Sequence, residues 1–221
     1  MQFERTPGFA LAYAGLALTY IDEFRSRAGA SREAAALKAI EYAEQAAALD
    51  DTLPQAHFAV GYVRLYGQAD HEGAILEAKR ALAENPNYAD AYALLSSAYF
   101  FAGELGKTLE LDREAMRLNP AASFVYDMHL GRKYFLEGRF RKALDFFLMG
   151  AAKDYNYVPT QVWLAATYAK MGDLDEATWA AEQVRILMPE FTIDDWMQFR
   201  PYKKPEHREA LVEGLKLAGL K

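Results

Sequence analysis

The chain has 221 residues, and its 31 acidic side chains outnumber the 25 lysines and arginines to give a formal net charge of −6. This balance argues against a nucleic-acid partner, because binding duplex DNA requires a basic face to neutralise phosphates. The chain contains no cysteine, which excludes disulfides, cysteine-ligated zinc and a cysteine nucleophile and fits a reducing cytoplasm. No long uncharged apolar run occurs, so we expect no membrane span, and the charged first residues do not resemble a signal peptide.

Hydrophobic periodicity predicts helices throughout the chain and no strands. Asp70 is expected to cap the fourth helix, and Asp173, with Glu176 three residues later, is expected to form a capping box at the tenth. The connections are short, so successive helices should be antiparallel neighbours. In chain order, the expected helices span residues 8–27, 31–49, 54–67, 70–84, 87–102, 105–118, 122–137, 139–153, 157–171 and 173–187, followed by a short helix over 192–199 and an amphipathic helix over 206–220.

A pattern of Leu, Tyr and Gly at four-residue spacing occurs three times, at intervals of 35 and then 34 residues. The spacing places all three residues on one stripe of a helix, and the glycine is expected to end the helix in a left-handed turn. A small residue follows in the next helix at a matching interval, where two helices can approach closely. The three copies are Leu95, Tyr99 and Gly103; Leu130, Tyr134 and Gly138; and Leu164, Tyr168 and Gly172, and their small residues are Thr108, Ala143 and Ala177.

These residues, together with Asn85-Pro86 and Asn119-Pro120 at the ends of two units, resemble the tetratricopeptide repeat. The second repeat fits less well, and aligns Val60, Arg64 and Gln68 with the Leu, Tyr and Gly positions. The resemblance implies an all-α fold, a right-handed superhelical solenoid of stacked antiparallel helix pairs. We expect a single domain over residues 1–221, with five repeats at about 7–50, 54–86, 89–120, 123–154 and 158–189 and a C-terminal cap over 191–221.

The C-terminal tail provides both the expected cap and a second resemblance. Its apolar side chains are expected to cover the exposed end of the fifth repeat. Phe199-Arg200-Pro201 and the closing residues 214–220 also resemble the ends of tetratricopeptide regions attached to bacterial adenylate and guanylate cyclases and to winged-helix regulators. The resemblance implies an interaction or sensor module of a larger signalling protein, and the cyclase catalytic motifs are absent.

No catalytic, cofactor or metal site is predicted. The four histidines lie at no helical ligand spacing, and the sequence contains neither a nucleophile elbow nor a phosphate-binding glycine loop. Asp173, Asp175 and Glu176 are interpreted as acids at a helix start rather than as metal ligands. We therefore expect a protein that is not an enzyme and that needs no cofactor.

The first helices of such repeats line the inner wall of the superhelix, and the positions beside the Leu/Tyr/Gly stripe are the candidate ligand groove. These positions are rich in aromatic residues with a few basic ones, the composition of binding hot spots. The Lys and Asn pattern with which some relatives clamp a C-terminal carboxylate is absent. The candidate residues are Phe58, Tyr62, Tyr66, Asp90, Phe100, Phe101, Met128, Arg132, Phe135 and Lys170.

Two functional hypotheses remain from the sequence. The first is a protein–protein interaction module that binds a peptide or protein segment in the aromatic groove. The second is a self-association device of a multidomain bacterial protein, suggested by Trp179 and Phe147 on second helices and by Trp196 in the tail. Both hypotheses predict a protein partner and possible homo-oligomers, and neither involves nucleic acid or membrane.

Overall fold

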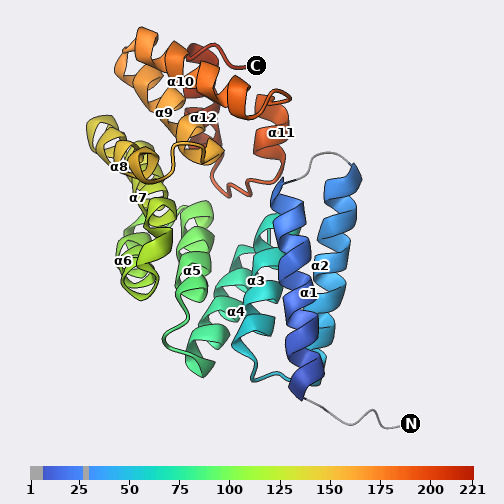
Figure 1. Cartoon of the computed structure of the whole chain (residues 1–221). Coiled ribbons are helices and arrows are strands. Elements are labelled where there is room, and N and C mark those ends of the chain that lie inside the picture. Colours follow the sequence, from blue (N-terminus) through green and yellow to red (C-terminus); the bar gives the residue numbers. More distant parts are fainter. Residues whose placement is uncertain (1–6, 27–29) are drawn as a thin grey trace. The chain divides into compact units, whose positions relative to one another are not determined.

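The structure is a computed structural model that describes residues 7–26 and 30–221, and helix is the only regular secondary structure in these two ranges. The all-α prediction is therefore confirmed, and the helix bounds agree with the expected ones to within a few residues. Figure 1 shows the α-helices, and short 3-10 turns over Leu105–Lys107 and Pro120–Ala122 precede α6 and α7. The α-helices are α1 Pro7–Ser26, α2 Ala30–Leu49, α3 Pro54–Gln68, α4 His71–Glu84, α5 Ala89–Ala102, α6 Thr108–Leu118, α7 Ser123–Leu136, α8 Phe140–Lys153, α9 Val158–Met171, α10 Leu174–Leu187, α11 Ile193–Gln198 and α12 Pro205–Leu217.

The chain divides into two compact units, unit 1 over residues 1–98 and unit 2 over residues 99–221, with the division inside α5. In unit 1, α1 packs against α2 and α3 packs against α4 as hairpins. In unit 2, the corresponding hairpins are α7 with α8 and α9 with α10. A helix pair of this length cannot bury its apolar face alone, so each hairpin also packs against the next within its unit, as α2 does on α3 and α8 on α9. That the two units form one domain stays a prediction.

The repeated glycines end their helices as the sequence predicts. Gly103 has a φ of +81°, a left-handed conformation that a residue without Cβ adopts without strain. Its N–H donates to the Phe100 carbonyl and the Glu104 N–H donates to the Tyr99 carbonyl, which satisfies the last carbonyls of α5. The same pair of hydrogen bonds recurs at Gly138 and at Gly172, whose φ angles are +72° and +86°.

The second repeat is one residue out of the register that the sequence alignment predicted. The left-handed residue after α3 is Ala69, with a φ of 55°, rather than Gln68. Leu65 is fully buried, whereas Arg64 is only half-buried. Leu65 and Ala69 lie 34 residues before Tyr99 and Gly103, so the structure keeps the period and Val60, Arg64 and Gln68 do not occupy the Leu, Tyr and Gly positions.

The predicted small residues lie where second helices pack. Thr108, Ala143 and Ala177 are all buried near the starts of α6, α8 and α10. In unit 2 the core beside them is aromatic, since the Phe147 ring of α8 stacks on Trp163 of α9 with ring centroids 5.9 Å apart. Each such ring buries a large apolar area where the hairpins pack together.

Buried side-chain hydrogen bonds bridge helices at two further positions. Nδ1 of His57 lies 2.8 Å from Glu77 on α4, and its Nε2 lies 2.6 Å from the Asp51 carbonyl. Nδ1 of His129 on α7 lies 3.0 Å from Asp112 on α6, which is fully buried. These contacts account for two of the four histidines as packing elements, because a buried polar group needs a partner.

The C-terminal helices do not continue the stack. Within the units, α3 packs on α2, α7 on α6 and α9 on α8, each on the second helix of the hairpin before it, whereas α12 packs mainly on α9, a first helix. Gly214 makes this possible, because a Cβ at that position would lie 3.0 Å from both Cβ and the carbonyl oxygen of Ala166. Leu211 and Leu215 are buried on the same helix, but Leu217 is exposed. The tail thus covers a side of the last hairpin other than the end that the sequence predicted.

Candidate functional site: an aromatic face in unit 1 and a covered face in unit 2

In unit 1, the predicted groove residues of α3 form a row of rings. Phe58, Tyr62 and Tyr66 follow each other at four-residue spacing and are all half-buried. The ring centroids of Phe58 and Tyr62 are 6.0 Å apart, and those of Tyr62 and Tyr66 are 4.5 Å apart. We call this row the α3 face. Its rings hold each other in place, so an aromatic surface of this kind can be contacted at little cost in side-chain entropy.

Tyr88, just before α5, extends the α3 face, and the sequence analysis missed it. Its ring centroid lies 5.7 Å from that of Phe58. Burial raises the pKa of the Tyr88 hydroxyl, and the negative charge of Asp90 raises it further, so the ring stays neutral at physiological pH. Asp90 itself is exposed in the first turn of α5. The predicted groove position of Asp90 therefore borders the α3 face with a negative charge.

In unit 2, Phe100 and Phe101 at the end of α5 are both only 2% exposed, so they are not the open groove wall that the sequence predicts. The segment of residues 199–204, which we call the arm, packs against both rings. The Tyr202 ring meets Phe100 and Phe101 edge-on, with centroids 5.9 and 5.0 Å apart. The backbone N–H of Lys203 donates to the Phe101 carbonyl over 2.9 Å.

Arg132 of α7 packs on the same two rings. Its guanidinium carbon lies 4.3 Å from the Phe100 centroid and 5.7 Å from the Phe101 centroid, which are cation–π distances. Only 7% of Arg132 is exposed, and its Nε and Nη2 atoms are buried without a hydrogen-bond partner. The predicted basic groove residue is therefore close to the predicted aromatic ones, but it lies beneath the surface.

The remaining predicted residues of unit 2 are also occupied. Met128 is buried, and Phe135 is packed between the Phe140 and Trp163 rings at 5.2 and 5.1 Å, which makes it a core residue rather than a groove residue. Lys170 of α9 forms an ion pair with Glu213 of α12 over 2.5 Å. We call Phe100, Phe101, Arg132, Ala166 and Lys170 together the first-helix face of unit 2. The arm and α12 lie on it.

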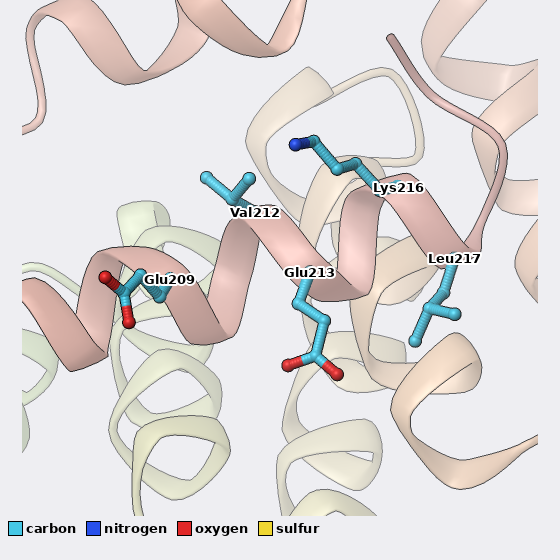
Figure 2. A pocket seen from close by; sticks show the side chains of 5 residues that line it. All are labelled: Glu209, Val212, Glu213, Lys216 and Leu217. Carbon is cyan, nitrogen blue, oxygen red and sulfur yellow. The ribbon is translucent and has the colours of Figure 1, made fainter.

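The cavities found do not mark a ligand pocket. A void among α1, α2 and α3 beside Tyr62 and Tyr66 measures about 10 Å³, space for no more than a water molecule. A shallow surface depression lies over α12, and Figure 2 shows that its five lining side chains all come from that single helix. One helix cannot enclose a small molecule, so the structure favours contacts on extended faces. Across residues 7–26 and 30–221, no three His, Asp or Glu side chains gather as a metal site.

Sequence comparisons give no match: no protein-family model and no curated protein matches the chain. Comparison with solved structures gives many matches. A thermophilic tetratricopeptide-repeat protein of Thermus thermophilus, TTC0263, superposes with a TM-score of 0.68 at 22% identity, covering 94% of this chain and 99% of that one. The chain has the tetratricopeptide-repeat fold. The resemblance stated from the Leu/Tyr/Gly pattern is thereby confirmed, and so is the solenoid class.

Two further tetratricopeptide-repeat structures have a similar architecture. PilW, a type IV pilus biogenesis factor, matches with a TM-score of 0.68 at 16% identity over 93% of this chain and 90% of its own. YrrB, a tetratricopeptide-repeat protein with an unusual peptide-binding site, matches with a TM-score of 0.52 at 18% identity over 82% and 87%. At these identities the likeness establishes the fold alone. None of the helices in the described residues is long and apolar enough to cross a membrane.

Proposed function

We propose that the chain is a non-enzymatic, cytoplasmic interaction module that binds a peptide or protein segment on its first-helix surfaces. The observation that carries the proposal is the α3 face, where Phe58, Tyr62 and Tyr66 form a continuous, half-buried aromatic row on a rigid hairpin. Aromatic side chains on rigid elements are the usual anchors of a protein interface. The peptide-binding site of YrrB, a protein of the same fold, supports this class of ligand.

The test compares variants of the α3 face with a matched variant on the second helix of the same hairpin. Tyr62→Ala removes the central ring of the row, and Leu76→Ala removes an exposed apolar side chain of α4. Proteins captured from a bacterial lysate on the wild-type chain are identified by mass spectrometry, and each is then purified and titrated by calorimetry against the three chains. We expect Tyr62→Ala to weaken binding at least about tenfold and Leu76→Ala to leave it unchanged.

Circular dichroism provides the folding control, since Tyr62→Ala should keep the helical signal. Equal binding of the purified partner by all three chains would exclude the α3 face. A partner that is lost only with Leu76→Ala would assign binding to the second helices instead.

A second candidate function, self-association, has an observation of its own. The second-helix side of unit 2 exposes several large apolar side chains, with Trp179 52% exposed. The Trp179 ring lies 6.3 Å from that of Tyr155, and both are exposed on the same side. Of the other residues that suggested this function, Phe147 and Trp196 are buried. The exposed apolar residues are Leu148, Met149, Tyr155, Leu174, Trp179 and Ile186.

Sedimentation equilibrium over a range of concentrations distinguishes this candidate. Self-association through this side of unit 2 predicts a dimer that Trp179→Ser weakens and Leu76→Ala does not. A chain that stays monomeric at high concentration would exclude it. Such a dimer would suit a regulatory part of a larger bacterial signalling protein, the role that the C-terminal resemblance implies.

A further inference from the structure

Two different chemical groups meet at the rings of Phe100 and Phe101. Tyr202 from the arm packs against both rings edge-on, at 5.9 and 5.0 Å. The guanidinium of Arg132 lies over the same rings, at 4.3 and 5.7 Å. A position that accepts an aromatic side chain therefore lies next to a cation, on the first-helix face of unit 2.

The cation is incompletely satisfied. In the part of the chain that the structure describes, Arg132 forms no ion pair, and its Nε and Nη2 hydrogens have no acceptor. Burying a charge without its counterion is costly, and ring faces compensate only in part. A guanidinium presents Nε–H and Nη–H side by side, in the geometry that matches the two oxygens of a carboxylate. The carboxylate of an Asp or Glu side chain would therefore supply the acceptors that Arg132 lacks.

The arm supplies an aromatic ring for Phe100 and Phe101 but no carboxylate for Arg132. It offers the Tyr202 ring and a backbone hydrogen bond from the Lys203 N–H to the Phe101 carbonyl. Residues 200–204 contain no acid, and Arg200, Lys203 and Lys204 repeat the charge of Arg132. The arm has no helix or strand of its own, and segments without regular secondary structure open at a lower free energy than packed helices.

We propose that the first-helix face of unit 2 is a docking site for a peptide segment carrying an aromatic side chain beside an Asp or Glu, and that the arm occupies its aromatic half in the unliganded chain. The partner's ring replaces Tyr202 against Phe100 and Phe101, and its carboxylate accepts the two open hydrogens of Arg132. The proposal rests on the function proposed above and extends it, since it names the chemistry of the ligand and a competitor within the chain.

The test uses two series of fluorescein-labelled decapeptides built from Gly and Ser. Each peptide of the first series carries one Phe and one Asp, one to four residues apart, and the second series has Asn in place of Asp. Fluorescence anisotropy is measured with the full wild-type chain, with Tyr202→Ala, and with Tyr202→Ala combined with Arg132→Gln. Tyr155→Ala removes an exposed tyrosine elsewhere in unit 2 and serves as the matched control.

We expect the best Asp peptide to bind Tyr202→Ala about tenfold more tightly than it binds the wild type, because the competing ring is gone. We also expect it to bind that variant at least about tenfold more tightly than its Asn counterpart does. This preference for Asp should vanish when Arg132→Gln is added, and Tyr155→Ala should behave as the wild type. Equal binding of the Asp and Asn series by Tyr202→Ala, or no binding by either, overturns the proposal.

Lys203→Pro provides a second route, since it removes the N–H that bonds to the Phe101 carbonyl and keeps every ring. It too must raise the affinity for the Asp series, and an unchanged affinity in a chain with normal helicity contradicts the role of the arm. A purified partner that depends on Tyr62, combined with no preference for Asp peptides, leaves the proposed function standing and rejects this inference alone. Dimerisation of Tyr202→Ala without bound peptide would assign the face to a second copy and would also reject it.

Discussion

The α3 face of unit 1 and the first-helix face of unit 2 both lie on first helices of the repeat, yet they present different surfaces. On α3 the rings of Phe58, Tyr62 and Tyr66 are half-buried and pack along the helix on each other. In unit 2, Phe100, which lies 34 residues after Tyr66, and its neighbour Phe101 are buried and pack against Tyr202. A repeat pattern therefore predicts which positions face a groove, but the residues that follow the last repeat decide whether that groove is open.

The largest expected effects come from the cores of the two units. Phe147→Ala in unit 2 should lower the free energy of unfolding by about 3–5 kcal/mol, because it empties a fully buried ring site. Leu65→Ala in unit 1 should lower it by about 2–5 kcal/mol for the same reason. If the chain is one domain, as the sequence predicts, both variants shift a single transition in urea unfolding followed by circular dichroism. Two transitions, each sensitive to one variant, would show that the units unfold separately.

The helices and their ends were predictable from sequence because their causes are local. Gly103 ends α5 with a positive φ that only its type of residue adopts easily, and four-residue spacing places Leu95 and Tyr99 in the core. Asp70 caps α4 through a hydrogen bond from the Gly73 N–H, as predicted. Asp173 occupies the N-cap position of α10, but its side chain accepts no hydrogen bond from a backbone N–H of the first turn, so the predicted capping box is only half correct.

The surface of the candidate site was not predictable in the same way, because its burial depends on contacts between residues far apart in sequence. Phe135 has the same hydrophobic character as Phe58, but it packs against the rings of Phe140 and Trp163 and is a core residue. The alignment of the second repeat failed because Ala69, not a glycine, takes the left-handed turn. One signal was present, since a glycine inside a helix, Gly214, often marks a close approach of two backbones.

A smaller effect measures how firmly the arm lies on unit 2. Gly103→Ala and Gly138→Ala both force a side chain into a left-handed residue, at a cost of about 1–2 kcal/mol each. At Gly103 the added Cβ would also come within 2.6 Å of the Lys204 side chain, whereas nothing lies near Gly138. Because the exposed Lys204 side chain is flexible and can move aside, we expect Gly103→Ala to be only slightly more destabilising than Gly138→Ala. Thermal unfolding gives the comparison, with Gly106→Ala as the control because nothing lies within 4 Å of its added Cβ.

The ion pair between Lys170 and Glu213 should contribute less. Glu213 is exposed, so water and salt screen the pair, and Glu213→Gln should cost no more than about 1 kcal/mol. The loss should shrink further in 1 M salt, where the Debye length is about 3 Å. Chemical denaturation with urea, at low and high salt, measures both values. A loss of several kcal/mol would mean that this pair, rather than the apolar contact of Leu211 and Leu215 with α9, holds α12 on unit 2.

The smallest expected effect is a pH dependence at the start of α12. Burial lowers the pKa of His207, and the positive charge of Lys204 lowers it further, against a weaker opposing contribution from Glu206. The folded chain therefore binds a proton at His207 less readily than the unfolded chain, whose histidine titrates near 6.5. His207 thus leaves the stability of the fold unchanged above pH 6.5 and lowers it as the pH falls below that value. His207→Gln should remove this part of the slope. Hydrogen exchange of the α12 amides at pH 7.5 and 5.5 is the measurement, and an equal loss of protection in both chains would show that other groups cause it.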